Sequence, residues 1–589
     1  MKVLNANIDM LVLEYLKDIL KQVICVQDAN KLFLKEFGIV DFFLEENELV
    51  QLKEDVFIDT NYLSELDRSE YGDFQTNKQL SENVAKIIKK KGSCPKLIIE
   101  PTCGKGNFII ALLNNFEKVE NIVGIEIYKP YIWEAKFQTI GFYLKHKREI
   151  KPKIHFFHES FFDFNFKEIA RRYKGQEILI IGNPPWVTNS ELGSLNSSNL
   201  PRKRNFKNHN GLDAITGKGN FDIAEYITLQ LIDIFQEFSG FLSLLVKKSV
   251  IKNIIYNQKY KLLRIGNNQQ YAIDAKKEFD VSVEAALFLC TLNKSPELDC
   301  DDLDFYNANK MQNSFGWVEN NFVSNTLSYK KSALFDGVSP FEWRQGVKHD
   351  CSSIMELDKN RKGFSNKKGV TNIELENDLV YGILKSSDLK SEIVDEVRKY
   401  TIISQKKVGQ ETKYIQYHYP RTYNYLIKNI EEFNKRKSNI YKNKPLFSIF
   451  GIGDYSFKPY KVAISGLYKT YQFSLIIPKD GKPLMLDDTC YFLGFDKIDF
   501  AVFTLILLNS PLTIDFLKSI TFLDAKRVFT KEVLMRIDLL TIASEIEETY
   551  IAKELMRLNL ELSENINIDT WMDFLDEIQH IKNGQLELF

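Results

Sequence analysis

The sequence lacks the features that mark several common classes of protein. Its seven cysteines are scattered and no two form a C-x-x-C pair, so neither a disulfide framework nor a zinc site is expected. No apolar run reaches the roughly 18 to 20 uncharged residues that a membrane helix needs. The N-terminal apolar stretch contains acidic residues, unlike a signal peptide. We therefore expect a cytoplasmic protein with no bound metal and no membrane partner.

The sequence also lacks an excess of charge of either sign. It has 78 basic and 79 acidic residues and a formal net charge of -1, so any binding to nucleic acid must come from local basic surfaces. At 589 residues the chain is too long for one hydrophobic core, and we expect about two to four compact units. Its hydrophobic share of 44% and charged share of 27% are those of a globular protein.

Strands and helices alternate from about residue 96 to residue 300. This alternation is typical of an α/β domain with a Rossmann-like, mostly parallel, doubly wound sheet covered by helices on both faces. Buried strands are predicted at 96–100, 121–127, 153–162, 177–186 and 281–292, helices at 109–119, 129–144 and 222–238, and a strand leading into a helix at 240–251.

The domain plan follows from where this alternation begins and ends. The sequence before it has apolar residues at helical spacing, and the sequence after it is first acidic and then rich in short strands, turns and aromatic-basic segments. We expect a helical lead-in over 1–70, the α/β domain over 71–300, a connection over 301–339 and a mixed α+β domain with C-terminal helices over 340–589.

A glycine-bearing loop follows the first strand of the α/β domain. Glu100, Gly104 and Gly106 lie between that strand and a helix, where backbone N–H groups can meet a polar ligand. The loop has neither the third glycine of a dinucleotide fingerprint nor the ending of a phosphate-binding P-loop, so neither NAD nor ATP is supported. Glu126 ends the next strand, where a carboxylate can bind two ribose hydroxyls, and Ile127 beside it can lie against an adenine ring. The pair predicts a nucleoside site; the alternative is a packing loop followed by a solvated acid.

The strand at 177–186 ends in Asn183, Pro184, Pro185 and Trp186. Two acceptors, the Asn183 side-chain oxygen and the Pro184 carbonyl, can bind the two hydrogens of an adenine amino group and direct its lone pair outward. The prolines keep this carbonyl rigid, and Trp186 offers a stacking face for a base turned out of its helix. The alternative is a turn that ends the sheet with a packing tryptophan.

These motifs resemble the amino-methylating, S-adenosylmethionine-dependent DNA methyltransferases of restriction-modification systems, specifically the N6-adenine group in which the cofactor motifs precede the catalytic one. In "FQTNKQLSENVAKII", Asn77 stands where the family usually has proline. "HESFFDF" aligns Ser160 with the acid that binds the cofactor adenine, with Glu159 and Asp163 as neighbours, and "EFDVSV" places Phe279 where the family stacks on the flipped base. The resemblance implies that the cofactor is bound by Thr76, Glu100, Thr102, Gly104, Gly106, Phe108, Glu126, Ile127, Ser160 and Asn183.

Basic residues gather in two places outside these motifs. Arg202, Lys203, Arg204 and Lys207 lie in a long polar loop directly after the catalytic motif, and we expect them to contact phosphates; the alternative is a solvated loop. In the C-terminal domain basic residues recur among aromatics, which predicts a target-recognition surface. The DNA-binding candidates there are Arg344, Lys348, Lys435 and Arg436, although a plain surface role is the alternative for any single one.

The sequence therefore predicts a monomeric, site-specific adenine N6-methyltransferase of a bacterial or archaeal restriction-modification system. Its expected cofactor is S-adenosylmethionine, and its expected partner is double-stranded DNA, with a cognate restriction endonuclease as a further candidate partner. Three alternatives stay open: a bifunctional enzyme that both methylates and cuts, a methyltransferase acting on RNA, and a non-catalytic DNA-binding relative.

Overall fold

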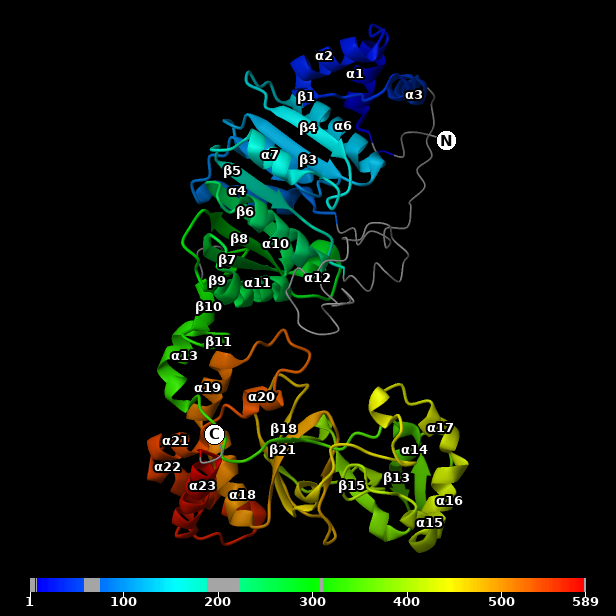
Figure 1. Cartoon of the computed structure of the whole chain (residues 1–589), viewed down its shortest axis with the longest axis vertical. Coiled ribbons are helices and arrows are strands. Elements are labelled where there is room, and N and C mark those ends of the chain that lie inside the picture. The colour runs from blue at the N-terminus through cyan, green and yellow to red at the C-terminus, as the bar shows by residue number, and fades with distance from the viewer. Residues whose placement is uncertain (1–5, 7, 58–74, 188–221, 308–310, 587–589) are drawn as a thin grey trace. The chain divides into compact units, whose positions relative to one another are not determined.

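The computed structural model describes residues 6, 8–57, 75–187, 222–307 and 311–586. The chain divides into two compact units, Met1–Phe322 (unit 1) and Val323–Phe589 (unit 2), which Figure 1 colours from blue to green and from green to red. Among the described residues no single helix is long and apolar enough to span a membrane, and only one bent pair, Ile498–Leu508 with Pro511–Ile520, meets that test jointly.

Unit 1 is built on a sheet of eleven strands in the order β1-β4-β3-β2-β5-β6-β8-β7-β9-β10-β11. The strands from β1 to β6 in this order are parallel, and β8 is antiparallel to its neighbours β6 and β7. The strands are β1 (Ile39–Val40), β2 (Leu97–Glu100), β3 (Asn121–Glu126), β4 (Lys153–His158), β5 (Ile178–Gly182), β6 (Gly240–Lys247), β7 (Ile265–Ile273), β8 (Ala285–Leu292), β9 (Asp299–Asp304), β10 (Met311–Val318) and β11 (Asn321–Val323).

Helices cover both faces of this sheet (Figure 1). The right-handed crossover rule places α5 and α6, which lead from β2 toward β4, on one face, and α7, α10 and α11, which lead the opposite way, on the other. The described helices of unit 1 are α1 (Met10–Leu20), α2 (Val26–Phe37), α3 (Glu46–Phe57), α4 (Lys78–Lys90), α5 (Asn107–Asn115), α6 (Lys129–Lys145), α7 (Phe166–Arg172), α10 (Ile223–Phe235), α11 (Lys248–Lys261) and α12 (Ala275–Phe279).

Local sequence explains where the central elements begin and end. All residues of β2 and β5 are buried, as expected for parallel strands covered on both faces. Asn77 caps the N-terminus of α4, where its side chain accepts a hydrogen bond from the Leu80 N–H. Asp222 caps the N-terminus of α10 in the same way and accepts a hydrogen bond from the Ala224 N–H. Side-chain oxygens at these positions satisfy N–H groups that have no partner within the helix. The mostly parallel, doubly wound α/β fold expected from the sequence is confirmed.

The segment at 301–339 does not form the simple connection expected from its acidic composition. It contains part of β9, then β10 and β11, and the helix α13 (Thr326–Ser332), and the division between the two units falls within it. Two residues of β9 face the interior of unit 1: Cys300 is 1% exposed and Leu303 is 8% exposed. The aspartates of this strand are exposed or half-buried. These two buried residues give β9 an inward face, and it pairs with β7 and β10 within the sheet.

Unit 2 is a mixed α+β unit with two five-stranded sheets, ordered β12-β21-β18-β19-β16 and β14-β13-β17-β15-β20. Its strands are β12 (Arg344–Gln345), β13 (Glu356–Asn360), β14 (Gly363–Asn366), β15 (Val380–Leu384), β16 (Ile393–Val394), β17 (Lys399–Ile402), β18 (Tyr460–Ser465), β19 (Ser474–Ile476), β20 (Met485–Leu486) and β21 (Cys490–Phe495). Its remaining α-helices are α14 (Ser352–Met355), α15 (Tyr414–His418), α16 (Pro420–Lys428), α17 (Ile430–Asn434), α18 (Ile498–Leu508), α19 (Pro511–Ile520), α20 (Lys531–Leu534), α21 (Leu539–Glu545), α22 (Glu548–Leu562) and α23 (Thr570–Leu586).

Candidate active site

The sequence motifs of unit 1 meet at the carboxyl edge of its sheet. Strand β2 lies between β3 and β5, and all three run parallel, so their last residues, Glu100, Glu126 and Gly182, end at the same edge. The chain leaves β2 and β5 toward opposite faces of the sheet, and the crevice at such a switch point is where open α/β sheets bind ligands.

The glycine loop takes a backbone shape that favours glycine. Gly104 and Gly106 have φ angles of 50° and 80°, in the left-handed region that side chains disfavour. A Cβ on Gly106 would lie 2.9 Å from the Cβ of Ala135 on α6. The two glycines therefore let α5 start close to α6, with its first N–H groups facing the sheet edge.

Glu126 holds this loop in place. Its Oε2 accepts a hydrogen bond from the Gly104 N–H at 2.9 Å, and its Oε1 accepts one from the Tyr128 N–H at 2.8 Å. A carboxylate oxygen has two lone pairs and can accept from more than one donor. The acid expected to bind a ribose thus also fixes the loop beside it.

Glu100 is buried, and no cationic side chain among the described residues forms an ion pair with it. Its side chain is 2% exposed, and its Oε2 has no hydrogen-bond partner among the described residues. Burial raises the pKa of Glu100 well above its ordinary range, and the negative charge of Glu126 raises it further. A buried carboxyl group of this kind binds a cationic donor readily, because the donor relieves the cost of ionising it.

Asn183, directly after β5, is held by two threonines. Its Nδ2 donates to the Thr76 hydroxyl at 3.2 Å, and its backbone carbonyl accepts from the Thr102 hydroxyl at 3.3 Å. The Thr76 carbonyl accepts in turn from Asn107 Nδ2 at 2.8 Å. A chain of hydrogen bonds therefore joins the start of α5, the segment before α4 and the Asn-Pro-Pro-Trp motif.

Trp186 and Phe279 contact each other. Their ring centroids are 4.9 Å apart with an interplanar angle of 71°, and Trp186, which is 4% exposed, donates from Nε1 to the Leu245 carbonyl at 3.1 Å. A base stacked between two rings needs about 7 Å, twice the usual carbon–carbon contact distance. Phe279 therefore has to move from its place against Trp186 if both rings are to stack on one base.

Helix α12, which ends at Phe279, is tied to the segment before α4. Asn77 Nδ2 donates to Glu278 Oε2 at 2.8 Å, so the residue that replaces the family's proline both caps α4 and holds α12. A cavity of about 450 Å³ lies against α12 and is lined by the end of β7 and the start of β8.

Three other predicted cofactor residues lie around the same edge. Ile127 follows β3 and is half-buried, and its carbonyl lies 2.9 Å from His158 Nε2. Ser160 is half-buried after β4, and its hydroxyl oxygen accepts from the Phe162 N–H. Phe108 is 2% exposed within α5 and packs in the core. Arg202, Lys203, Arg204 and Lys207 lie outside the described residues.

The four DNA-binding candidates of unit 2 all have partners within the chain. Arg344 forms an ion pair with Glu342, Lys348 one with Asp350 at 3.7 Å, and Lys435 one with Glu432 at 2.6 Å. Arg436 donates to the Ser448 carbonyl at 2.7 Å and lies 3.8 Å from the centroid of the Tyr441 ring.

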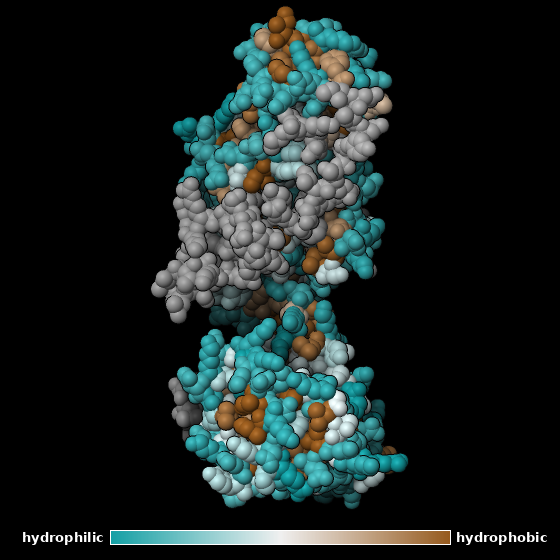
Figure 2. Space-filling view, turned by 90° about the vertical axis from the view of Figure 1, so that its right-hand side faces the viewer, coloured by the Kyte–Doolittle hydropathy of each residue, from teal (hydrophilic) through white to brown (hydrophobic). Residues whose placement is uncertain are grey.

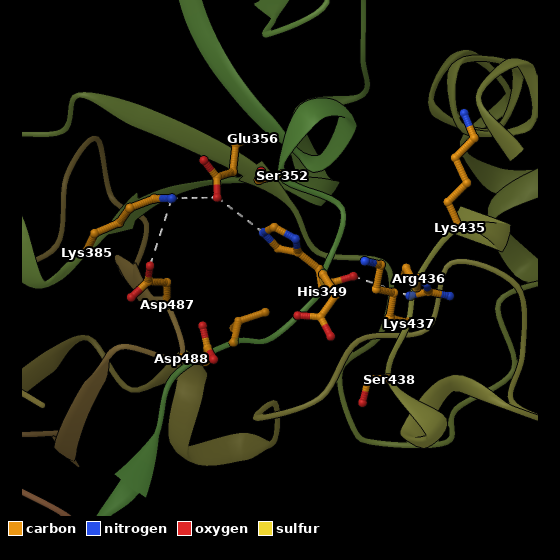
Figure 3. Close-up of a pocket in the computed structure, with 12 residues that line it drawn as sticks. His349, Ser352, Glu356, Lys385, Lys435, Arg436, Lys437, Ser438, Asp487 and Asp488 are labelled. Carbon is orange, nitrogen blue, oxygen red and sulfur yellow. Dashed lines mark hydrogen bonds and ion pairs between the residues drawn. The ribbon is translucent and has the colours of Figure 1, made fainter. Parts of the chain in front are cut away.

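Two of these candidates, Lys435 and Arg436, line a polar cavity of about 720 Å³ (Figure 3). Glu356, 4% exposed, lies in its wall and binds Lys385 Nζ at 2.6 Å and Lys367 Nζ at 2.8 Å. His349 Nε2 lies 3.7 Å from the same carboxylate. The charges of this cavity are largely paired within the chain.

Sequence reasoning missed Asn107, Leu245 and Glu278. Asn107 directly follows the glycine loop, so the loop motif itself could have indicated it. Leu245 acts through its backbone carbonyl, which no side-chain pattern reveals, and Glu278 is 201 residues from its partner.

The strand order, the glycine loop with its two carboxylates and the Asn-Pro-Pro-Trp motif after β5 together define the methyltransferase class whose methyl donor is S-adenosylmethionine. No family model matches the chain. The chain is 40% identical over 482 residues to the type II methyltransferase M.NspV of Nostoc sp. (strain ATCC 29411 / PCC 7524), covering 81% of this chain and 98% of that protein. It therefore belongs to the type II methyltransferases of restriction-modification systems, and the family resemblance to restriction-modification methyltransferases is confirmed.

Two solved structures are also similar. The type IIL restriction-modification enzyme MmeI in complex with DNA has 12% sequence identity and a TM-score of 0.49, covering 95% of this chain and 75% of that chain. The EcoKI M protein of a type I restriction enzyme has 11% identity and a TM-score of 0.27, covering 51% of this chain and 60% of that chain.

Proposed function

We propose that this methyltransferase acts on duplex DNA and methylates the N6 amino group of an adenine that is flipped out of the helix. The observation that carries the proposal is the fixed orientation of Asn183. Because its amide nitrogen donates to Thr76, its amide oxygen is turned to the other side and can accept from the amine. Among the described residues no donor reaches the Pro184 carbonyl, which can accept the second amine hydrogen.

These two acceptors explain how the chain makes a poor nucleophile reactive. The lone pair of an aromatic amine is delocalised into the ring, and two fixed acceptors favour a pyramidal nitrogen whose lone pair points outward. Fixed dipoles need no reorganisation during the reaction, which is the main advantage of a preorganised site. Pro184 and Pro185 keep the backbone stiff at this point.

The residues at the sheet edge fit S-adenosylmethionine. The buried carboxyl group of Glu100 suits the cofactor's ammonium group, and the oxygens of Glu126 suit the two ribose hydroxyls. When bound, the cofactor supplies a methyl group attached to a positively charged sulfur. The half-buried Ile127 and Ser160 are our candidates for contacts to the cofactor adenine.

Trp186 and Phe279 suit a base that leaves the duplex. Their rings contact each other edge to face, with Trp186 buried and Phe279 half-buried. Base flipping requires such a stacking surface, because the base loses its neighbours in the helix.

A substrate comparison tests this function. The purified protein is incubated with tritiated S-adenosylmethionine and, in parallel, with duplex DNA, RNA and protein, and the labelled DNA is digested to nucleosides. We expect label in DNA as N6-methyladenine. Label in cytosine, or in RNA or protein alone, would contradict the proposal, and magnesium-dependent DNA cleavage would identify a bifunctional enzyme.

Asn183→Ala tests the mechanism within the same assay. We expect methyl transfer to fall at least 100-fold, about 3 kcal/mol of transition-state stabilisation, with cofactor binding unchanged. Asn114→Ala, at an exposed position near the end of α5, serves as the matched control and should remain active. An active Asn183→Ala enzyme would refute the proposed role.

A further inference from the structure

One part of unit 2 is far more basic than the rest of the chain. Residues 404–449 include α15, α16 and α17. They contain ten Lys and Arg but three Asp and Glu, a formal net charge of +7, whereas the whole chain has a formal net charge of -1. We call this part the basic lobe. A local excess of this size marks a surface for a polyanion, because like charges held together repel unless a partner neutralises them.

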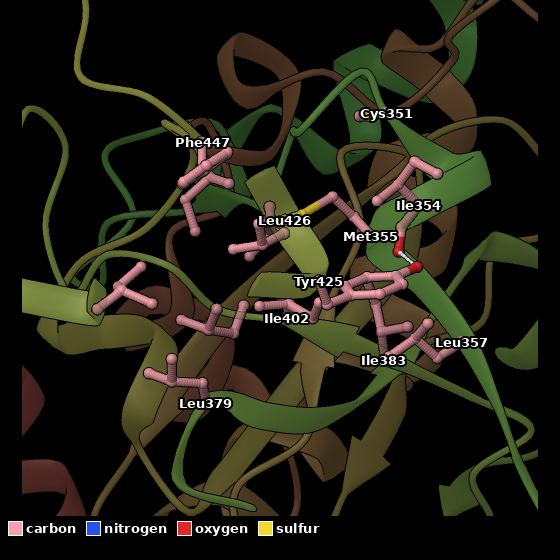
Figure 4. Packing of buried hydrophobic residues seen from close by; sticks show 14 of the residues in the cluster. Cys351, Ile354, Met355, Leu357, Leu379, Ile383, Ile402, Tyr425, Leu426 and Phe447 are labelled. Carbon is pink, nitrogen blue, oxygen red and sulfur yellow. Dashed lines mark hydrogen bonds between the residues drawn. The ribbon is translucent and has the colours of Figure 1, made fainter. Parts of the chain in front are cut away.

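The lobe is a rigid structure, because it is built on one apolar core. Figure 4 shows Tyr425, Leu426 and Phe447 of the lobe packed with Ile383 and Ile402 of the adjoining sheet. All five are buried, with exposures of 9% or less. The backbone that carries the lysines is therefore fixed in place.

Hydrogen bonds hold the two lysine-bearing segments of the lobe, 404–413 and 435–449, against each other. The Ser404 hydroxyl donates to the Phe447 carbonyl at 2.6 Å, and the Thr412 hydroxyl donates to the Leu446 carbonyl at 2.6 Å. The Ile449 N–H donates to the Gln405 side chain at 2.9 Å. Segments that are separate in the sequence thus lie side by side.

The cations of these segments fall into two groups. Lys435 and Arg436 are occupied by Glu432, by the Ser448 carbonyl and by the Tyr441 ring, so they fix the shape of the second segment. The other cations are exposed and have no carboxylate within 4.0 Å among the described residues: Lys406, Lys407, Lys413, Lys437, Lys442 and Lys444.

The surroundings of these lysines also suit a nucleic acid. Tyr417 on α15 is 77% exposed, and aromatic side chains between cations are common where proteins meet sugars and bases. Figure 2 views unit 2 from the side of α15–α17 in Figure 1 and shows a mainly hydrophilic face with apolar patches within it. Exposed lysines with an exposed aromatic ring suit a phosphate backbone.

We propose that the basic lobe binds the phosphate backbone of the duplex DNA substrate through these six lysines, and that Lys435 and Arg436 act by fixing the surface. This inference rests on the proposed function. Of the DNA-binding candidates from the sequence, Lys435 and Arg436 thereby give way to the six neighbouring lysines, which have no carboxylate within 4.0 Å among the described residues.

Salt-dependent binding tests the proposal. The variant combines Lys437→Gln, Lys442→Gln and Lys444→Gln in the full-length protein, and binding to labelled duplex DNA is measured by fluorescence anisotropy at several salt concentrations. Each lysine that no longer neutralises a phosphate makes the slope of log K against log salt shallower by about 0.9. We expect the slope to become shallower by about 2 to 3 and the affinity at moderate salt to fall about tenfold or more.

The control removes three charges elsewhere in unit 2, from exposed lysines, by Lys330→Gln, Lys331→Gln and Lys553→Gln. It should leave the slope within about 0.5 of the wild-type value. An unchanged slope in the lobe variant, or an equal change in the control, would overturn the proposal. So would tighter binding to an RNA duplex than to DNA of the same sequence. Wild-type protein that neither binds nor methylates DNA would instead refute the proposed function.

Discussion

Each unit contains an almost fully buried glutamate, and the two have opposite electrostatics. Glu100 of unit 1 is 2% exposed and Glu356 of unit 2 is 4% exposed. Burial raises the pKa of Glu100, and nearby Glu126 raises it further. Burial would also raise the pKa of Glu356, but hydrogen bonds from Lys367 and Lys385 outweigh it and lower the pKa.

The difference separates a carboxylate that stabilises the fold from one that is available to a ligand. Glu356 has its cations within the chain, so removing it breaks the ion pairs with Lys367 and Lys385. Glu100 has no ion-pair partner among the described residues, so a ligand that brings a cation gains the interaction. Burial alone therefore does not identify a functional acid; the partner on the same chain decides.

The largest expected effect is on unit 2. Glu356→Ala removes the carboxylate that binds Lys367 and leaves Lys385 with the more distant Asp487, at 3.9 Å. Breaking a fully buried pair costs about 3 to 5 kcal/mol. These lysines are 43% and 31% exposed and can turn toward water, so we expect a loss of about 2 to 3 kcal/mol in the free energy of unfolding. Urea unfolding followed by tryptophan fluorescence measures it. Glu374→Ala, at an exposed glutamate, is the control. Equal losses in the two variants would show that Glu356 has no special stabilising role.

The next largest effect is the loss of stability of unit 2 in acid. Burial lowers the pKa of His349 to about 4 from its ordinary 6.5. Between these values the unfolded chain binds a proton that the folded chain does not, so stability falls as the pH falls. We expect unit 2 to lose about 2 kcal/mol between pH 7 and pH 5, and His349→Leu to remove most of this dependence in unfolding measurements at the two pH values. A His349→Leu protein with the wild-type pH dependence would show that other groups cause it.

We expect the stability of unit 1 to change with pH in the opposite direction. Because the pKa of Glu100 is raised, the ligand-free folded protein holds a proton that the unfolded chain has lost, and stability falls as the pH rises above the ordinary carboxyl range. Glu100→Gln removes this dependence without destabilising the ligand-free protein. We expect it to weaken S-adenosylmethionine binding about tenfold, about 1.4 kcal/mol, as measured by titration calorimetry.

The exposed Glu117→Gln is the control for that experiment. If Glu100→Gln instead destabilised the ligand-free protein and left cofactor affinity unchanged, Glu100 would be structural in the same way as Glu356, and the contrast between the units would disappear.

Local patterns predicted the edge of the sheet, because strands β2, β3 and β5 are short apolar runs followed by glycine or polar residues. They could not predict contacts that depend on the folded chain. The Thr76 to Asn183 hydrogen bond spans 107 residues, and the basic run at 435–437 gave no sign that Arg436 is held by the Ser448 carbonyl. The acidic strand β9 was missed because its two inward residues are too few to form a visible pattern.

The smallest expected effect concerns chemistry rather than stability. Thr76→Val keeps the shape of the side chain but removes the oxygen that accepts from Asn183 Nδ2 at 3.2 Å, so the amide can rotate away from its productive orientation. We expect kcat to fall about fivefold, about 1 kcal/mol, with unchanged S-adenosylmethionine affinity and melting temperature, and Thr76→Ser to retain kcat. Loss of cofactor affinity in the valine variant would show that Thr76 contacts the cofactor instead. A valine variant with the wild-type kcat would show that the hydroxyl of Thr76 has no part in orienting Asn183.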